Sequence, residues 1–255
     1  MTITLSGAPL LSFLIASIRI TSWMAVAPPF NNRAIPPMAK VILALSLSML
    51  MAPELANQTL PSDFPSLFVV IVTQVAVGVA MGFVTMLLFS AIQAAGSLID
   101  LFGGFQLAAA FDPLSLNTNS VFGRFHEMLA FVLLVTTGGH LLVLGGLLNT
   151  FRYLPIDGSP DLSSWPTVFT TAVGMFFSVA FQIALPLAAV LFVSDLALAL
   201  LTKVAPALNA FTIMFPVKIA LTLMLVGLSF PVLPNALERL ISLINDAIGT
   251  LGGAS

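Results

Sequence analysis

Charged residues and cysteine are scarce in this sequence, and both absences narrow the class of protein. Only 7% of its 255 residues are Asp, Glu, Lys or Arg, against about 25% in a soluble domain. A folded chain with so few charges would not stay dispersed in water. The sequence contains no cysteine, which excludes a disulfide framework and a thiolate metal site. Its formal net charge of -2 excludes the broad basic surface of a nucleic-acid-binding protein.

Apolar residues are what the chain has in abundance. Hydrophobic residues make up 59% of it, and the mean hydropathy is +1.11. We therefore expect an all-α, membrane-associated protein. No basic region precedes the first apolar run, so we expect no cleaved signal peptide. Six apolar stretches mark the expected helices: residues 5–27, 41–52, 67–95, 126–150, 167–202 and 216–233.

These stretches do not have the uniform length of simple membrane spans. A spanning helix needs about 20 residues. The stretch at 41–52 is too short, and the stretch at 167–202 would reach about 50 Å against a hydrocarbon core of about 30 Å. Pro186 lies inside the long stretch and predicts a kink, because its ring removes a backbone donor and clashes with the previous turn. The lengths therefore favour bent helices over six straight spans.

Basic residues in the connecting segments are unevenly distributed. If six spans are threaded, one side of the membrane receives Arg33, Lys40, Arg124, Lys203 and Lys218. The other side receives Arg152 and Arg239 with most of the loop acids. By the positive-inside rule the first set is cytoplasmic, and both termini lie on the opposite side.

The tail from Asn235 onward has a different pattern. Its apolar residues recur at three- and four-residue spacing, and they are Leu237, Leu240, Ile241, Ile244, Ile248 and Leu251. Polar residues fill the other face, which predicts an amphipathic helix. Asn235 with Glu238 resembles a capping box at its start. Packing on a partner helix and lying on a membrane surface both remain open.

Six charged residues lie within or beside the apolar stretches: Arg19, Asp100, Glu127, Asp195, Lys203 and Lys218. A charge in mid-membrane costs about 2.5–3.5 kcal/mol on insertion scales, so each should pair, reach an interface or face water. An end-of-helix anchor or internal salt bridge is one interpretation, and a transport pathway or subunit contact is the other. Lys203 follows Asp195 by two turns on roughly the same face.

The sequence shows no pattern that indicates catalysis. His126 and His140 are not placed with other ligands at metal-binding spacing, and a lone helical histidine is most often a satisfied core residue. Gly-rich phosphate loops, nucleophile elbows and paired-carboxylate sites are absent from the sequence. We expect no enzymatic activity, no cofactor and no metal site.

The centre of the chain interrupts this apolar character. Residues 103–125 read GGFQLAAAFDPLSLNTNSVFGRF, with paired glycines, an Asp-Pro and a polar run before the apolar pattern returns. The apolar residues Leu107, Phe111, Leu114 and Leu116 could close a hydrophobic constriction. Non-helical backbone at apolar depth is tolerated where it is buried in protein or lines a water-filled cavity. An ordinary interfacial loop is the alternative interpretation.

The central region resembles the FliR family of flagellar export-gate subunits, whose injectisome counterparts are related. The resemblance is carried by FDPLSLNTNSVFGRFHEMLAFVLLVTTGGHLLVLGGLLNTFRYLPI, residues 111–156. Its markers are Phe111-Asp112-Pro113, Gly139-His140-Leu141 and the exit from Thr150-Phe151 to Leu154-Pro155. Their order and spacing are fairly specific, and the similarity spans nearly the whole chain.

The C-terminal part resembles the two-helix gate subunit FliQ. It has a long first hairpin helix, a polar turn, Phe215-Pro216-Val217-Lys218 and an apolar return. The inserted Val217 moves Lys218 by one position from the FliQ pattern. Because the FliR family is understood as a FliP-like part fused to a FliQ-like part, the resemblance implies two regions. They are residues 1–165, FliP-like with a plug loop at 106–122, and residues 166–255, a FliQ-like hairpin with the amphipathic tail.

The resemblance also implies an architecture and a role for the loop. In that family one FliR joins five FliP and four FliQ subunits in a closed cone of bent hairpins. The central loop projects into the export channel as a plug. The corresponding residues here are Gly103, Gly104, Leu107, Phe111, Asp112, Pro113, Leu114, Leu116 and Phe122.

Subunit contacts, partners and location follow from the same resemblance. The expected interface residues are Pro186, Asp195, Lys203, Met214, Pro216 and Lys218. The implied partners are FliP-like and FliQ-like subunits, FlhB-like and FlhA-like export proteins, unfolded export substrates and membrane lipid, but no nucleic acid. The implied location is the bacterial inner membrane at the flagellar basal body. The rival interpretations are a secondary transporter of a small solute, the equivalent injectisome subunit, and a membrane scaffold without a pore.

Overall fold

A computed structural model describes residues 7–32, 35–55, 58, 61, 63–106, 120–204 and 210–253. Every regular element in these residues is helical, which confirms the expected all-α class. The helices are α1 (Gly7–Val26), α2 (Pro37–Leu55), α3 (Phe64–Gly103), α5 (Val121–Thr136), α6 (Gly139–Tyr153), α7 (Trp165–Val204), α8 (Ala210–Val226), the 3-10 turn η1 (Gly227–Ser229) and α9 (Val232–Leu251).

Helix lengths depart widely from that of a simple span. Four helices among the described residues are long and apolar enough to cross a membrane, or up to six if the broken pairs α5–α6 and α8–α9 each count as one span. α3 and α7 have 40 residues each, which at 1.5 Å per residue is about 60 Å, twice the hydrocarbon core. The apolar stretch at 41–52 lies within a longer helix, the 19-residue α2. The chain is therefore an integral membrane protein whose two longest helices exceed the bilayer core.

The apolar stretch at 126–150 is two helices, where the sequence suggested one. Thr137 ends α5 with its backbone N–H bonded to Leu133 O, and Gly138 has a φ of +75°. A residue with a side chain adopts that left-handed conformation at a cost, and glycine adopts it freely. Gly138 therefore separates α5 from α6 in the middle of an apolar run.

The chain divides into two compact units, each built from separate segments. Unit 1 contains Met1–Leu88, Gly138–Val173 and Ile241–Ser255, and unit 2 contains Phe89–Thr137 and Gly174–Leu240. α3, α7 and α9 contribute residues to both units. This division describes how the chain packs. The boundary expected between residues 165 and 166 instead concerns the resemblance to two gate subunits, so that boundary stays a prediction.

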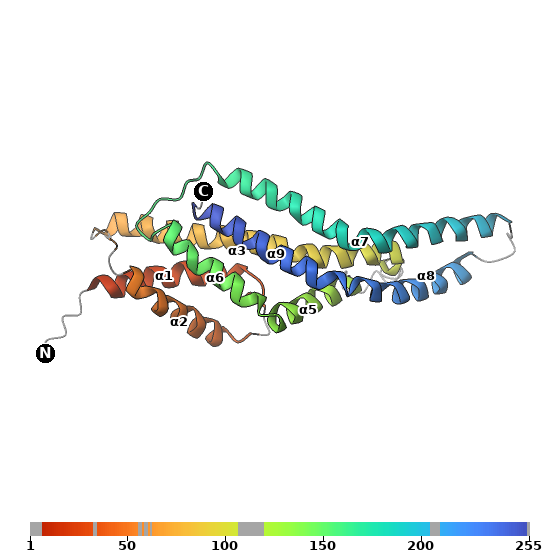
Figure 1. Ribbon diagram of the computed structural model, residues 1–255, viewed down its shortest axis with the longest axis horizontal. Coiled ribbons are helices and arrows are strands. Elements are labelled where there is room, and N and C mark those ends of the chain that lie inside the picture. The colour runs from red at the N-terminus through yellow and green to blue at the C-terminus, as the bar shows by residue number, and fades with distance from the viewer. Residues whose placement is uncertain are drawn as a thin grey trace. The chain divides into compact units, whose positions relative to one another are not determined.

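In unit 1, α1 packs against both α2 and α3. Ser12 near the start of α1 donates to the carbonyl of Leu55 at the end of α2 at 3.2 Å, so the two helices are antiparallel (Figure 1). A Cβ on Gly78 of α3 would lie 2.5 Å from Arg19 O, and one on Gly82 would lie 3.0 Å from Trp23 O. This small-xxx-small pair lets the backbones of α1 and α3 approach closely.

Arg19 occupies the centre of unit 1 and is fully buried. Its Nε donates to Gln74 Oε1 at 2.6 Å, and Nη1 lies 3.4 Å from Thr150 Oγ1. The guanidinium carbon lies 4.3 Å from the centroid of the Phe151 ring, a cation–π contact. Gln74 in turn donates to Ile156 O at 3.2 Å. The side chain of Arg19 thus connects α1, α3 and the end of α6.

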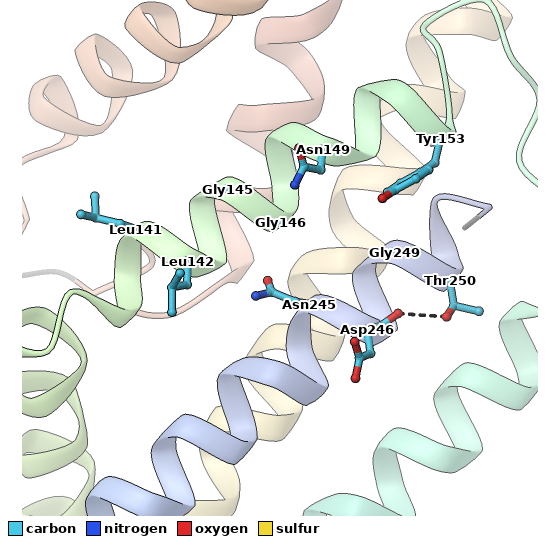
Figure 2. A pocket seen from close by; sticks show the side chains of 10 residues that line it. All are labelled: Leu141, Leu142, Gly145, Gly146, Asn149, Tyr153, Asn245, Asp246, Gly249 and Thr250. Atoms are coloured by element: carbon cyan, nitrogen blue, oxygen red, sulfur yellow. Dashed lines mark hydrogen bonds between the residues drawn. The ribbon is translucent and has the colours of Figure 1, made fainter. Parts of the chain in front are cut away.

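The C-terminal part of α9 packs against α6 within unit 1. The apolar residues that recur there at three- and four-residue spacing are buried, with Ile241 at 5%, Ile244 at 2% and Ile248 at 0% exposure. A Cβ added to Gly146 of α6 would overlap the side-chain oxygen of Asn245 in α9. Figure 2 shows Asn245 directed from α9 toward Gly146. The tail is therefore a helix packed on a neighbouring helix of the same chain.

In unit 2, the end of α7 and α8 lie side by side as a hairpin (Figure 1). Pro216, a residue type that usually breaks helices, lies inside α8, which runs from Ala210 to Val226. A proline inside a membrane helix is tolerated when neighbouring groups satisfy the freed carbonyl. α7 likewise continues through Pro186, and its ribbon changes direction near the middle of the helix.

Candidate functional site at the base of the central loop

Asp100, near the end of α3, holds the start of α5. Its carboxylate oxygens accept the backbone N–H of Phe122 at 3.1 and 3.2 Å, and one of them also accepts the hydroxyl of Ser120. Ser120 Oγ accepts the backbone N–H of Gly123 at 2.8 Å. Asp100 is only 1% exposed. A buried carboxylate at a helix N-terminus satisfies unpaired donors and opposes the positive end of the helix dipole.

Two glycines permit this contact between α3 and α5. A Cβ on Gly96 would overlap the carbonyl of Phe122, and one on Gly123 would overlap Ser120 Oγ and lie 2.7 Å from Ser97 Oγ. Only bare backbone fits at both positions. The first turn of α5 is therefore seated directly on α3, about two turns before α3 ends.

The other end of the loop leaves α3 against α8. α3 ends at Gly103, where a Cβ would lie 2.8 Å from the side chain of Thr222. Gly104 follows with a φ of +81°, and its Cβ position lies 3.5 Å from Lys218 Cδ. A side chain at Gly104 would be strained by its backbone conformation. The paired glycines thus make the turn out of α3.

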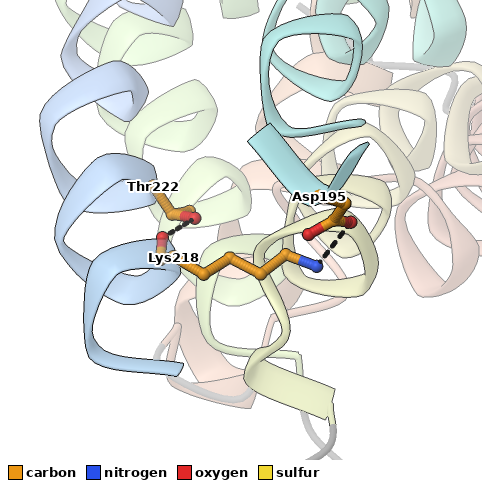
Figure 3. A network of polar contacts seen from close by, with 3 residues as sticks. All are labelled: Asp195, Lys218 and Thr222. Carbon is orange, nitrogen blue, oxygen red and sulfur yellow. Dashed lines mark hydrogen bonds and ion pairs between the residues drawn. The ribbon is translucent and has the colours of Figure 1, made fainter. Parts of the chain in front are cut away.

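Lys218 and Asp195 form an ion pair beside this turn (Figure 3). Lys218 Nζ lies 2.8 Å from Asp195 Oδ2, with the side chains 13% and 29% exposed. Thr222 Oγ1 donates to the carbonyl of Lys218 at 2.8 Å and is buried. The pair joins α7 to α8, and the stem of Lys218 passes over Gly104.

The two ends of the loop also meet through aromatic side chains. Phe105 and Phe122 have ring centroids 5.0 Å apart in an edge-to-face arrangement, which adds to the stability of the contact. Phe122 is 6% exposed and lies in the first turn of α5. The expected loop boundary at 122 is therefore wrong, because Val121 and Phe122 are helical and Asp100 holds their amides in place.

His126 extends the buried network one turn further along α5. Its Nδ1 lies 2.8 Å from Phe122 O, and its Nε2 lies 3.1 Å from Ser229 Oγ. Ser229 belongs to η1, between α8 and α9, and donates to Val226 O at 2.6 Å. His126 is thus a core histidine that links α5 to η1.

The structure brings together five of the residues singled out in the sequence: Gly103, Gly104, Phe122, Asp195 and Lys218. Six others lie outside the described residues, namely Leu107, Phe111, Asp112, Pro113, Leu114 and Leu116. Asp195 pairs with Lys218, whereas Lys203 is exposed in the last turn of α7. Pro186 and Pro216 are exposed, and Met214 is half-buried.

Sequence reasoning noted Asp100 as a charge in an apolar stretch but missed its role. It also missed Gly96 and Thr222, and it did not identify Ser120 as the N-cap of α5. A signal was present for Ser120, since a serine that precedes an apolar helical run is a common N-cap. No local pattern connects Thr222 to Gly103, because their contact is between helices far apart in the chain.

The interactions at this site are structural, because they hold segments of the chain against one another. The groups of the site are carboxylates, hydroxyls, an ammonium and backbone amides that pair with one another. Within the described residues no three of the side chains that ligate metals gather in one place. What the arrangement does is hold Phe105, Ser120 and Phe122, which flank residues 107–119, close to the last turn of α3.

An all-α membrane protein with an anchored central loop is the class that fold and site define. The chain belongs to the bacterial export proteins, family 1, whose family model matches residues 10–244. It is 34% identical over 234 residues to the flagellar biosynthetic protein FliR of Pectobacterium carotovorum subsp. carotovorum, covering 92% of this chain and 90% of the relative. It is 34% identical over 235 residues to FliR of Escherichia coli (strain K12), with the same coverage. FliR of Bacillus subtilis (strain 168) is 25% identical over 248 residues, with 94% and 96% covered.

Proposed function

We propose that this chain is the FliR-type subunit of a flagellar protein-export gate, and that its central loop closes the export channel. It acts without catalysis, as one copy among FliP-like and FliQ-like subunits. FlhB-like and FlhA-like proteins are further partners. The gate lies in the bacterial inner membrane at the flagellar basal body, where unfolded flagellar proteins pass through it.

The observation that carries this proposal is the double anchor of the loop. Asp100 binds the chain at Ser120 and Phe122. Gly104, four residues after Asp100 in the sequence, turns the chain out of α3. The segment between them therefore leaves and returns within about one helical turn, which is about 5.4 Å. A loop whose ends are held on rigid helices can be presented as one body. A channel closure needs this property, because it must resist water and ions without detaching.

Similarity in sequence supports the same role. The curated relatives named FliR match this chain over about nine-tenths of its length. The central markers and both anchors fall within the part matched by the family model, residues 10–244. No observation in unit 1 or unit 2 favours a small-solute transporter over an export subunit.

A deletion that respects the anchors tests the proposal. Residues 107–119 are replaced by a short Gly-Ser linker, so that Gly104, Phe105, Ser120 and Phe122 are kept. We expect the gate to assemble with its partners in normal yield and the cells to become permeable to small ions and solutes. Conductance and dye entry in cells expressing the assembled complex measure this. An assembled gate that stays impermeable after the deletion contradicts the proposal.

Asp100→Ala is a second test, in which the sequence of residues 107–119 is unchanged. Loss of the carboxylate leaves the amide of Phe122 and the hydroxyl of Ser120 without their buried acceptor, so the loop is held less firmly. We expect leakage below that of the deletion and above that of the wild type. Glu127→Ala is the control, because Glu127 is an exposed carboxylate on α5, the helix whose start Asp100 holds. Equal leakage from both variants would show that the anchor has no part in closure.

A further inference from the structure

A groove lies between α6 and α9 in unit 1. Its volume is about 550 Å³. Its lining comes from Leu141, Leu142, Gly145, Gly146, Asn149, Tyr153, Asn245, Asp246, Gly249 and Thr250. Figure 2 shows these residues on α6 and α9. None of the residues expected from the sequence to form the plug or the subunit interface lies in it.

The lining of the groove is mixed: Leu141 and Leu142 are exposed apolar residues, and the polar groups beside them are mostly neutral. Asn149 and Asn245 supply amides, while Tyr153 and Thr250 supply hydroxyls. Asp246 is the one charged residue of the lining, and no lysine or arginine contributes to it. A lipid headgroup phosphate would be repelled rather than bound. Amides and hydroxyls instead match the donors and acceptors of a peptide backbone.

The helix that forms one wall differs from the others in what it exposes. The residues of α9 that are exposed in unit 1 are Ser242, Asp246 and Thr250, all of them polar. On the same helix Glu238 and Arg239 are exposed as well. α7, in contrast, exposes large apolar side chains such as Phe192, Val193 and Leu200. Exposed side chains elsewhere on this chain are largely apolar. A face that exposes only polar side chains is therefore a face that contacts water.

Glycines keep the groove open. A Cβ added to Gly145 would meet no atom within 4 Å, so this position borders empty space. Gly146 on the next position packs against Asn245 and is needed for helix contact. The side-chain oxygen of Asn245 is buried there and accepts no hydrogen bond within the described residues. The groove is thus a space between two helices that are themselves firmly packed.

We propose that the α6–α9 groove is a polar wall of the export path and contacts an extended, unfolded polypeptide in transit. This inference rests on the proposed export function. Neutral amides and hydroxyls can exchange hydrogen bonds with any peptide backbone, whatever its side chains. A conduit must also bind its cargo weakly enough to release it, and a groove without cations or large aromatic pockets meets that requirement.

Site-specific photocrosslinking tests the contact in the assembled gate. A photoreactive amino acid replaces Asn149 or Asp246, both exposed, in the full chain co-expressed with its partners. The cargo is an export substrate fused to a stably folded domain, so that it stalls in the channel. The control probe replaces Leu200, which is 64% exposed on the apolar face of α7. We expect both groove probes to capture the stalled substrate and the Leu200 probe not to capture it.

The possible outcomes separate the two proposals. If probes within residues 107–119 capture the substrate while the groove probes capture only gate subunits or lipid, the groove inference is overturned and the export function stands. If no probe in the groove or the loop captures substrate in an assembled gate, the export function itself fails. Capture by Leu200 as strongly as by the groove probes would also overturn the inference.

A matched pair of substitutions tests whether the groove matters for transport. Gly145→Phe fills the groove, and Gly174→Phe adds the same ring to α7 at another position where a Cβ meets nothing within 4 Å. We expect Gly145→Phe to reduce the export rate several-fold while the amount of assembled gate stays normal. Gly174→Phe should export at the wild-type rate. Unchanged export from Gly145→Phe in a normally assembled gate overturns the inference.

Discussion

Buried polar side chains in this protein act as fixed connections between helices. Arg19 joins α1 to Gln74 of α3 and to Thr150 of α6, and Asp100 joins α3 to α5. Each lies in surroundings where water cannot replace a lost partner. Removing one partner therefore costs the desolvation of the group left behind as well as the bond itself.

Arg19→Ala should lower the free energy of unfolding of the purified protein by about 3 kcal/mol. The change leaves a cavity beside Phe151 and leaves the Gln74 oxygen without its donor. Arg152→Ala is the control, because Arg152 pairs with Glu54 at 3.0 Å on the surface, with the side chains 67% and 48% exposed. Exposed pairs contribute about 0–1 kcal/mol. Denaturation in detergent measures both, and equal losses would contradict the structural role of Arg19.

Acid should loosen the first turn of α3 through Asp63. Hydrogen bonds from the side chain of Ser66 and from its backbone N–H, the latter at 3.0 Å to Asp63 Oδ2, hold the pKa of Asp63 below its usual value. The folded pKa lies below the unfolded one, so these bonds stabilise the helix start above about pH 4. That stabilisation is lost as the pH falls through the folded pKa.

Hydrogen exchange at residues 64–67 between pH 3 and pH 6, corrected for intrinsic rates, measures this effect. We expect protection to fall toward pH 3 in the wild type. Asp63→Asn, which keeps an acceptor oxygen without the titrating proton, should show a flatter dependence. The same pH dependence in both proteins would assign it to another group.

At the scale of the element, close helix crossings are made by glycine. Gly78 and Gly82 admit the backbone of α1, and Gly96 with Gly123 admits α5 to α3. Association of helices in lipid has no hydrophobic drive between apolar faces, so close packing supplies much of the attraction. These glycines therefore set which helices meet and where.

Gly78→Leu should prevent normal packing of α1 on α3. The first added carbon would already lie 2.5 Å from a backbone oxygen of α1, which cannot rotate away. We expect loss of monodisperse protein on size-exclusion chromatography in detergent. Gly174→Leu is the matched control, because its Cβ position is open. A monodisperse Gly78→Leu protein with wild-type thermal stability would show that α1 and α3 do not need this crossing.

At the scale of the whole molecule, the hairpin of α7 and α8 carries two lysines with different surroundings. Lys218 is paired with Asp195 inside unit 2, while Lys203 is exposed near the end of α7. Both were expected from the sequence to contact neighbouring subunits. The structure gives Lys218 an internal partner, so the two lysines should respond differently to charge reversal.

Lys218→Glu should destabilise the isolated chain by about 2 kcal/mol, because it places a second carboxylate beside Asp195. The swap Asp195→Lys with Lys218→Glu should recover most of that loss. Lys203→Glu should change the unfolding free energy by less than about 0.5 kcal/mol and should reduce only the recovery of FliQ-like partners. Thermal unfolding and co-purification separate these effects, and a destabilised Lys203→Glu chain would contradict this assignment.

Composition and spacing determined the class of this protein and the character of its segments. The scarcity of charge and the apolar stretches predicted an all-α membrane protein, and the lengths predicted helices unlike simple spans. The spacing of Leu237, Leu240, Ile244 and Ile248 predicted the buried face of α9. These features depend on the spacing of apolar residues and on the free energy of transferring their side chains out of water. Both can be read from a short window of sequence.

Only the tertiary structure decided which polar residues meet. Asp195 pairs with Lys218 across the hairpin instead of with Lys203 on its own helix, and Asp100 meets Ser120 beyond a 19-residue gap in the sequence. Pro216 remains inside α8, and Phe122 belongs to α5. Such contacts depend on how close two helices approach and on which groups burial leaves unsatisfied. Both are properties of the packed chain, so no local pattern contains them.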